Sequence, residues 1–378
     1  MIIKNLSKSE LLFWLQLSRT VGEVTFHSLI QLYGTAENAL EQLAAIQKGT
    51  KKIRSLSKAD ALKELELTEK FNASILSSCE NKYSKTLRVI RDPPPVLTVK
   101  GNIELLNTPS IAIVGSRNAT INSCNFAYSL ARELAEEGYT IISGLATGVD
   151  TAALKITDST LPTIAIIGTG IDQYYPAENQ RLQEKIIERG GLVATEVPFG
   201  KRGQSVHFAR RNRIISGLSE CVIIIEASEN SGSLLTAQYA LAQGKYLFAS
   251  PGAPYDKRFS GSNRLLKQGA MLIENALDVI QSLNKKKRND FAYKTLLDVE
   301  DKEFIPFSIL NYDSDKMNHI KAQILKKIDS TSVPINQLAY ELKIPEKTLL
   351  LAIVELEIEG KITRTIGNEV SLLYDQFI

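Results

Sequence analysis

A series of six short apolar runs between residues 110 and 250 most constrains the fold of this chain. The runs are rich in β-branched residues, carry no charged side chain, and lack the alternation of a strand with one face in water. Helical stretches separate them, which indicates a parallel sheet covered by helices on both faces. We therefore predict a doubly wound α/β domain over residues 105–283, with strands at Ile111–Val114, Thr140–Ser143, Thr163–Ile167, Leu192–Ala194, Val222–Ile225 and Tyr246–Ala249.

The N-terminal segment, residues 1–90, predicts a small helical domain. Leucines recur at helical spacing, and Gly22 and Gly34 divide the pattern into short helices. Ser7 lies three residues before Glu10, which is the spacing of a capping box at the start of a helix. No convincing strand precedes residue 80.

The C-terminal segment, residues 313–378, has the outline of a winged helix. Three apolar stripes at helical spacing precede two β-like runs that predict a hairpin. A linker at 284–312 opens with the basic run 285–288, for which a solvated tether is favoured over a DNA-binding or targeting role. The C-terminal segment holds eight basic and ten acidic side chains, so we expect it to contact protein rather than DNA.

Composition excludes several classes of protein. The net charge of +3 over 378 residues is too small to indicate a nucleic-acid partner by itself. No apolar run approaches about 18 residues and no signal peptide is evident, so we expect no membrane partner. Three widely spaced cysteines are typical of free thiols in a reducing compartment, and we predict a cytoplasmic protein.

Glycines and small hydroxyl residues follow the predicted strands. In a parallel sheet these positions meet at one edge, outside the carboxyl ends of the strands, where ligands bind. Glycine lets a backbone approach a ligand closely, and serine at a helix start leaves N–H groups that suit a phosphate. Any one such turn is more often a plain tight connection, but five turns on one edge favour an anion site. The residues assigned to it are Gly115, Ser116, Gly144, Gly168, Gly170, Ser231, Gly232 and Ser233.

The stretch Lys201–Arg213 is the strongest single indication of a partner. It carries no acidic residue, whereas protein surfaces usually mix both signs of charge. Arginine and lysine neutralise phosphates, and an aromatic or histidine ring lets a base stack without regard to sequence. With Arg117, the stretch predicts nucleic-acid or polyphosphate binding, although Arg213 has the alternative of a structural ion pair. The residues concerned are Lys201, Arg202, His207, Phe208, Arg210, Arg211 and Arg213.

Candidate catalytic residues are sparse. The histidines His27, His207 and His319 fall one in each segment, and no Cys/His cluster has the spacing of metal ligands. Neither G-x-G-x-x-G nor a Walker A lysine follows a strand. Asp150 and Asp172 each follow a glycine loop, where holding the loop or capping a helix is favoured over acid–base chemistry. From the motifs we predict no catalytic residue, no metal and no cofactor.

In their order along the chain these motifs resemble the DNA-processing protein A (DprA/Smf) family. The motifs that carry the resemblance are Gly115-Ser116-Arg117, Ser143–Asp150, Gly168–Asp172 with Tyr175-Pro176, His207–Ser219, Ser231–Ala237 and Pro251-Gly252. The resemblance implies a Rossmann-like fold, with a SAM- or helix-hairpin-helix-like domain before it and a winged helix after it. It also implies a non-enzymatic homodimer that binds single-stranded DNA and loads the RecA recombinase during natural transformation. Strand binding is placed at Arg117, Arg211, Asn212 and Arg213.

The chain departs from the family pattern at several positions. The departures are Thr147 where arginine is frequent, Leu154 for histidine, Ala177 for a basic residue, Ala209 for proline, and the absence of a basic residue near Ser205. The displaced charge could come from Lys201, Arg202 and Arg210.

Two other classes of function remain open. Nucleoside-monophosphate phosphoribohydrolases share this Rossmann-like group but carry P-G-G-x-G-T-x-x-E, whereas residues 251–254 here read Pro-Gly-Ala-Pro and lack such a glutamate. A sensor of one small nucleotide needs only one or two positive charges, which is fewer than the basic stretch holds.

Two expectations concern binding and assembly. We expect Arg117→Ala and Arg211→Ala each to weaken DNA binding without unfolding the domain. We expect a homodimer through Asn263–Leu277, where apolar residues exceed the needs of one helix face, although core burial accounts for most of them. These residues are Leu265, Leu266, Met271, Leu272 and Ile273.

Overall fold

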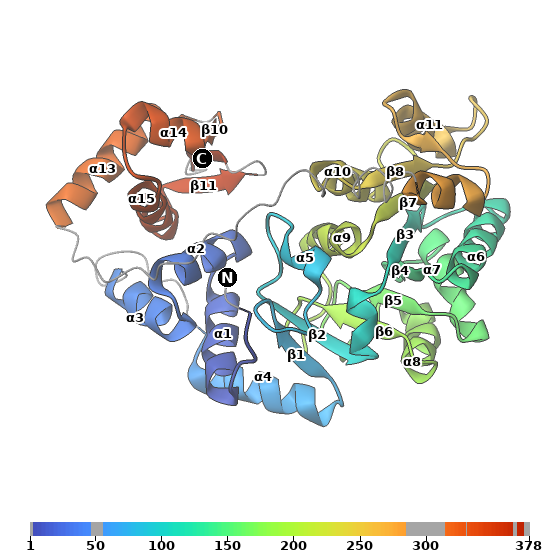
Figure 1. Cartoon of the computed structure of the whole chain (residues 1–378), viewed down its shortest axis with the longest axis horizontal. Coiled ribbons are helices and arrows are strands. Elements are labelled where there is room, and N and C mark those ends of the chain that lie inside the picture. The colour runs from blue at the N-terminus through green and yellow to red at the C-terminus, as the bar shows by residue number, and fades with distance from the viewer. Residues whose placement is uncertain (1–2, 47–55, 285–313, 330, 366–368, 374–378) are drawn as a thin grey trace. The chain divides into compact units, whose positions relative to one another are not determined.

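The computed structural model describes residues 3–46, 56–284, 314–329, 331–365 and 369–373 (Figure 1). These residues form two compact units. One unit holds helices α1 to α3 together with the C-terminal helices and strands, and the other holds a large sheet with its covering helices. Apart from residue 284, the predicted linker lies outside the described residues. No described helix is long and apolar enough to cross a membrane.

Four helices follow one another at the N-terminus, namely α1 (Lys8–Thr20), α2 (Glu23–Tyr33), α3 (Ala36–Ile46) and α4 (Lys58–Lys70). The predicted capping box is confirmed, because Glu10 N donates to Ser7 Oγ at 3.2 Å and Ser7 N donates to the Glu10 carboxylate at 2.9 Å. Gly22 and Gly34 separate the helices as predicted, and Gly34 ends α2 with a φ of 78°.

The described C-terminal elements include the three predicted helices and the predicted hairpin, with one strand, β10, that the sequence did not predict. They are α13 (Ser314–Lys327), β10 (Val333–Pro334), α14 (Ile335–Leu342), α15 (Glu346–Ile358), β11 (Ile362–Thr365) and β12 (Glu369–Leu372). The strands form one sheet in the order β10-β12-β11. Apolar side chains from the three helices and from the hairpin meet in a single core.

Helix α2 contacts α15 within this unit. Thr25 Oγ1 donates to the Glu357 carboxylate at 2.7 Å, and Arg364 Nη1 donates to Ser28 Oγ at 3.2 Å. The Arg364 side chain is 5% exposed, and its Nε lies 3.3 Å from Glu357. Arg364, which follows α15 on the hairpin, therefore packs inside the protein and is not presented to solvent.

The second unit is built on a nine-stranded sheet in the order β1-β2-β6-β5-β4-β3-β7-β8-β9. From β6 to β9 in that order, neighbouring strands run parallel, which confirms the predicted doubly wound sheet. The predicted strands are β3 (Ser110–Gly115), β4 (Thr140–Ser143), β5 (Thr163–Ile166), β6 (Leu192–Thr195), β7 (Cys221–Ile225) and β8 (Tyr246–Ala249). A short strand, β9 (Met271–Leu272), extends the edge.

The predicted boundary between the helical segment and the sheet was wrong. Strands β1 (Ser74–Ser77) and β2 (Val96–Gly101), with the short helix α5 (Lys85–Arg88) between them, belong to the large sheet. They pair antiparallel with each other, and β2 pairs antiparallel with β6. A four-residue run is too short to reveal its period, so its identity as a strand depends on the partner that it meets in the fold. Residues 74–101 are therefore part of the α/β unit and not of a helical domain ending at 90.

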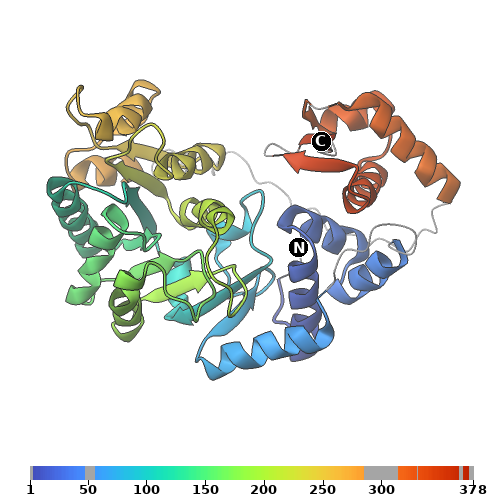
Figure 2. The same ribbon diagram turned by 180° about the vertical axis from the view of Figure 1, so that it is seen from behind.

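Helices cover both faces of the parallel strands (Figures 1 and 2). Along β3, Ile111 and Ile113 join the core on one face, whereas Ala112 and Val114 join the core on the other. The first layer contains α6 (Ile121–Glu136), α7 (Val149–Leu154) and α8 (Gln180–Glu188), and the second contains α9 (Ser205–Leu218), α10 (Ser233–Ala242) and α11 (Ser260–Lys267). The strands lack alternation because water reaches neither face.

The order of the strands reverses between β3 and β7. From β3 the chain builds β4, β5 and β6 toward one edge and then returns to build β7, β8 and β9 on the other side. Such a reversal opens a crevice outside the carboxyl ends of the two central strands, because their connections leave in opposite directions.

Candidate nucleic-acid interface

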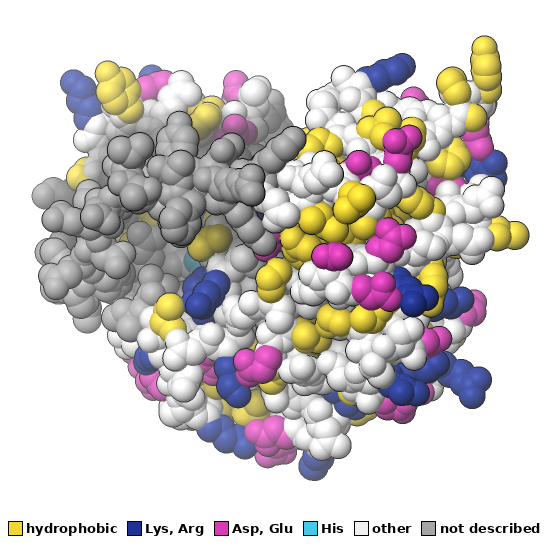
Figure 3. Space-filling model, turned by 45° about the vertical axis from the view of Figure 1, so that its right-hand side comes forward, with side chains coloured by type: hydrophobic (Ala, Val, Ile, Leu, Met, Phe, Trp, Pro, Cys, Tyr) yellow, Lys and Arg dark blue, Asp and Glu magenta, His cyan; other side chains and the backbone are white. Residues whose placement is uncertain are grey.

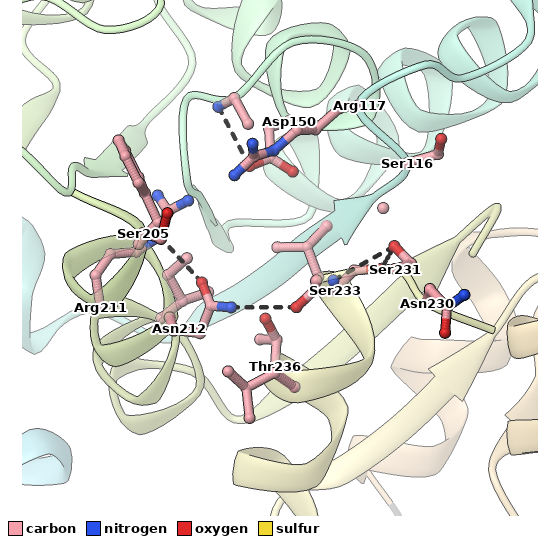
Figure 4. A pocket seen from close by; sticks show the side chains of 18 of the residues that line it. Ser116, Arg117, Asp150, Ser205, Arg211, Asn212, Asn230, Ser231, Ser233 and Thr236 are labelled. Atoms are coloured by element: carbon pink, nitrogen blue, oxygen red, sulfur yellow. Dashed lines mark hydrogen bonds between the residues drawn. The ribbon is translucent and has the colours of Figure 1, made fainter. Parts of the chain in front are cut away.

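A pocket of about 770 Å³ opens at this crevice (Figure 4). Its walls come from the loop after β3, the start of α7, the start of α9, and the segment that joins β7 to α10. The predicted turns after β3 and β7 thus meet at one site. Its polar lining includes Ser116, Arg117, Asn118, Asp150, Ser205, Arg211, Asn212, Asn230, Ser231, Ser233 and Thr236.

Arg117 is the exposed cation of the pocket lining. Hydrogen bonds to Glu226 hold the loop that carries it. The backbone carbonyl of Glu226, at the end of β7, accepts from Ser116 N at 2.8 Å. The Glu226 carboxylate accepts from Thr120 N at 2.9 Å and from Thr120 Oγ1 at 2.8 Å. Glu226 is fully buried and has a φ of 50°, a conformation that non-glycine residues adopt at a cost. The fold therefore holds the Arg117 loop in one place.

Arg211 differs from the prediction, because its guanidinium is buried inside the site. Only 4% of the residue is exposed, and its Nη1 donates to the carbonyl oxygens of Gly144 and Ile166. Burial lowers the pKa of Arg211 to about 10, Asp150 opposes this shift, and Arg117 adds to it. Arg211 thus links the ends of β4 and β5 to α9. Its buried guanidinium also contributes a positive charge to the pocket lining.

Asp150 and Asp172 hold loops, as predicted. Asp150 accepts from Gly144 N at 3.1 Å and from Ala146 N at 3.3 Å. Burial raises the pKa of Asp150, and Arg211 is the largest influence in the opposite direction. Asp172 accepts from Gly200 N at 2.7 Å. The Asp150 carboxylate therefore already accepts hydrogen bonds from the protein backbone.

Arg213 takes the structural alternative that the sequence left open. It is 2% exposed, its Nη2 lies 2.6 Å from Glu196, and its Nε lies 3.2 Å from Asp92. Arg213 lies in the interior of α9, a helix from Ser205 to Leu218. Residue 213 is absent from the pocket lining and its guanidinium is paired with Glu196 and Asp92, so the structure does not support its assignment to DNA.

Asn212 connects the arginine to the start of α10. Its Oδ1 accepts from Arg211 Nε at 3.0 Å, and its Nδ2 donates to the Gly232 carbonyl at 3.3 Å. Ser231 Oγ and Ser233 Oγ lie 2.7 Å apart at the same helix start. Figure 4 shows these serines across the pocket from Arg117. Asn212 therefore positions the hydroxyl side of the pocket relative to its cationic side.

The ring of Phe208 fills the space beside two glycines. A Cβ at Gly168 would lie 2.6 Å from this ring, and a Cβ at Gly203 would lie 2.5 Å from it. Tyr175 packs on Phe208 with ring centroids 4.9 Å apart, and the Arg117 guanidinium lies 5.8 Å from the Phe208 centroid. Phe208 thus supports both the cation and a second aromatic ring.

Three of the predicted glycines lie directly against internal groups of the protein. A Cβ at Gly144 would collide with the Arg211 guanidinium, and one at Gly170 would lie 2.7 Å from the Pro198 carbonyl. With Gly168 beside Phe208, these positions admit internal groups. Gly115 lines the pocket but is required by the Ile225 backbone, which its Cβ would meet. Among the predicted glycines, only Gly232 faces open space.

The rest of the basic stretch lies outside this pocket lining. Lys201, Arg202 and Arg210 are exposed, and His207 is half-buried. Burial and then the neighbouring Arg210 lower the pKa of His207 from 6.5, so the ring is neutral at neutral pH. Among the described residues His207 Nδ1 is buried without a hydrogen-bond partner. The predicted basic stretch therefore divides into residues that line the pocket and residues that lie outside its lining.

Comparison with known proteins decides the family. Residues 74–284 match the family described as DNA recombination-mediator protein A, and residues 8–66 match the DprA-like N-terminal HHH domain. The chain belongs to the DNA recombination-mediator protein A family. The two matched ranges agree with the boundary between α4 and β1 in the structure.

The matches to relatives within the family cover most of each relative's length. The chain is 40% identical to DNA processing protein DprA of Streptococcus pneumoniae over 208 residues, 55% of this chain and 72% of the relative. It is 31% identical to protein Smf of Escherichia coli over 310 residues, 80% of this chain and 79% of the relative.

Solved structures agree with the fold. DNA processing protein A from Streptococcus pneumoniae superposes with a TM-score of 0.61 at 30% identity, covering 74% of this chain and 98% of that one. The protein from Helicobacter pylori, which binds single-stranded DNA, superposes with a TM-score of 0.51 at 35% identity, covering 57% of this chain and 96% of that one.

The structure brings some of the residues that the sequence assigned to the site together at the pocket and places others elsewhere. Arg117, Ser116, Ser231 and Ser233 line the pocket as predicted. Tyr175 was quoted as part of a motif but was given no role, although it lies in the lining at 50% exposure. Its position in the loop that follows a parallel strand could have indicated from the sequence that Tyr175 lies at the site. Among the described residues, no group of three or more His, Cys, Asp or Glu side chains could hold a metal ion.

Proposed function

We propose that the chain binds single-stranded DNA in the pocket between β3 and β7, without regard to sequence. The observation that carries the proposal is the pairing of two guanidinium groups at the pocket. Arg117 is exposed there and acts electrostatically on the buried Arg211, while the carboxylate in the pocket lining, Asp150, accepts from backbone N–H groups. An excess of positive charge beside hydroxyl groups suits a phosphodiester.

Further support comes from the family. The Helicobacter pylori relative binds single-stranded DNA, and it covers 57% of this chain at 35% identity. The exposed residues Lys201, Arg202 and Arg210 extend positive charge along α9 and the loop before it, which suits a strand longer than one nucleotide. This supports DNA over a single small nucleotide as the ligand.

The test is the salt dependence of oligonucleotide binding by the full chain and by Arg117→Ala. We expect the logarithm of affinity to fall with the logarithm of salt concentration, with a slope of about −0.7 per phosphate contacted. Arg117→Ala should lower affinity by about 1.5–3 kcal/mol, because it removes a charged hydrogen bond, and should reduce the slope by about one contact. Its matched control is Arg132→Ala, an exposed arginine paired with Glu136 on α6, which should bind normally. A flat salt dependence, or tighter binding of duplex, would count against the proposal.

We also propose that the chain acts as a recombination mediator and not as an enzyme, in the cytoplasm, with the RecA recombinase as its partner. The support is the description of the family, DNA recombination-mediator protein A. Stimulation of RecA strand exchange by the purified chain tests the partner. Release of base from nucleoside monophosphates would favour the phosphoribohydrolase alternative instead.

We propose that the α/β unit forms a homodimer near Asn263–Leu277. Leu265 and Ile273 belong to the core, so they do not support an interface. Leu272 and Leu277 are 49% and 61% exposed and do support one. Figure 3 shows one face of the molecule, on which apolar side chains gather between charges of both signs. Leu277→Glu should give a monomer by ultracentrifugation, whereas the exposed Ile121→Glu should not change the mass.

A further inference from the structure

We propose that Tyr175 is the platform on which a base of the bound strand stacks. The inference rests on the proposed function, because it assigns one residue a role in holding single-stranded DNA. Aromatic rings bind bases without regard to sequence, since every base has a flat π-face. The sequence suggested Phe208 or His207 for this role, and the structure assigns it to neither.

Phe208 lines the pocket, but it is half-buried and protein groups contact its ring on several sides. Gly168 and Gly203 leave room for its ring, so close that an alanine at either position would touch it. Tyr175 lies against it at 4.9 Å between centroids, and the Arg117 guanidinium lies within 5.8 Å of its centroid. These neighbours leave less of the Phe208 ring free for a base than the half-exposed ring of Tyr175 offers. The ring is therefore a support for the residues in front of it.

His207 is also unsuited to the role. It is absent from the lining of the pocket, and its Nδ1 is buried. Tyr175, by contrast, lines the pocket and is 50% exposed. One part of its ring rests on Phe208 at an interplanar angle of 38°, which leaves the exposed half toward solvent.

The surroundings of Tyr175 suit a nucleotide unit. Tyr175 and Arg117 lie against the same ring, so a phosphate on Arg117 and a base on Tyr175 can belong to one short stretch of strand. Because Phe208 supports both residues, the cation and the stacking surface keep a constant spacing. A ring fixed in this way loses little conformational entropy when a base stacks on it.

The experiment compares two oligonucleotides of equal length, one of thymidine and one of abasic units, which share phosphates but differ in bases. The full chain should bind the thymidine oligonucleotide more tightly. Tyr175→Ala should weaken that binding by about 5- to 100-fold, leave binding of the abasic oligonucleotide unchanged, and keep the salt slope. The matched control is Tyr255→Ala, which removes a tyrosine that is 99% exposed outside the pocket lining and should change neither affinity.

A second variant gives a direct signal. Tyr175→Trp keeps an aromatic surface, and the chain has one other tryptophan, Trp14, which is 5% exposed. We expect this variant to bind thymidine oligonucleotides at least as tightly as the natural chain. Its indole fluorescence should be quenched by the thymidine oligonucleotide and not by the abasic one.

The outcomes separate the two proposals. If the natural chain binds neither oligonucleotide, the proposed function fails and the role of Tyr175 fails with it. If the natural chain binds DNA while Tyr175→Ala binds thymidine equally well, or loses both oligonucleotides equally, only the role of Tyr175 is overturned. If Tyr175→Ala does not fold, quenching of Tyr175→Trp by thymidine supports the role, and absence of quenching refutes it.

Discussion

The guanidinium of Arg213 lies 2.6 Å from the carboxylate of Glu196, inside the α/β unit and away from the pocket. Asp92, in the connection before β2, completes the ion pair at 3.2 Å. The pair therefore joins α9 to the segment after β6 and to the antiparallel edge of the sheet.

Arg213→Ala should destabilise the protein. Removal of one partner leaves the Glu196 side chain, which is 12% exposed, without its cation, and breaking a buried pair costs about 3 kcal/mol or more. Urea unfolding measures the loss. The control is Arg210→Ala, an exposed position on the same helix, which should change stability by less than about 0.5 kcal/mol. A stable Arg213→Ala variant with weakened DNA binding would return this residue to the site.

Arg211→Ala should also act on stability, contrary to the expectation from sequence. The substitution leaves two carbonyls at the ends of β4 and β5 without a donor, and leaves Asp150 buried without its cation. We expect a loss of about 3 kcal/mol or more in urea unfolding, together with weaker DNA binding, because the pocket also loses one positive charge. If the variant unfolds like the natural chain, the buried position of this guanidinium is incorrect.

Two glycines of the predicted site should respond in opposite ways. Gly168→Ala places a methyl group 2.6 Å from the Phe208 ring, so we expect a loss of about 1–3 kcal/mol and weaker DNA binding. Gly232→Ala meets no atom within 4 Å and has a φ of −61°, which alanine adopts freely. This variant should keep its stability to within about 0.5 kcal/mol. Equal effects in thermal unfolding would contradict the packing described for Phe208.

His207 should make stability depend on pH just below neutrality. Burial and Arg210 lower its pKa in the folded protein, whereas the unfolded chain has the ordinary value of 6.5. As pH falls through 6.5, the unfolded chain takes up a proton before the folded protein does, so stability decreases toward the lowered pKa. Above about pH 7 both states are neutral and the full stability is present.

The measurement is the urea midpoint at pH 7.5 and at pH 5.5. His207→Gln should show a smaller decrease than the natural chain, because its side chain does not titrate. His319→Gln, on the exposed side of α13, should decrease as much as the natural chain. An identical decrease in all three proteins would exclude this role of His207.

The C-terminal segment should contribute little to DNA binding. Of the two cations at its hairpin, Arg364 is 5% exposed and paired with Glu357, and Lys361 lies 2.7 Å from Glu359. Arg364→Ala should therefore leave duplex affinity unchanged while it destabilises this unit. Removal of residues 285–378 should change single-stranded DNA affinity by less than about threefold, roughly 0.65 kcal/mol. A larger loss would show that the segment holds DNA.

The charge argument for that segment was incomplete. The sequence suggested that acidic residues of α15 would repel phosphates. In the structure Lys321 lies 2.9 Å from Glu355 and 2.7 Å from Glu359, so much of that charge is neutralised within the unit. We still expect the segment to contribute little to DNA binding, because its basic residues Lys321, Lys361 and Arg364 are paired with glutamates.

The parallel sheet could be predicted from sequence because its central strands are buried on both faces. The requirement for apolar residues at every position is local, and it appears in the chain as runs such as Cys221–Ile225. The location of the site followed from the same pattern, since the carboxyl ends of parallel strands share an edge. Strand β1 was missed because an edge strand of four residues owes its identity to β2, a partner in the fold.

The roles of the arginines could not be predicted in this way. Arg117, Arg211 and Arg213 have the same chemistry, and two of them lie two residues apart on one helix. On a helix, residues two positions apart point in directions about 200° apart, so one guanidinium lies at the back of the pocket and the other lies between Glu196 and Asp92. The sequence by itself determined that basic residues gather near one edge of a parallel sheet. Only the tertiary structure decided which charge meets solvent, because the carboxylates and carbonyls that bury the others come from distant strands.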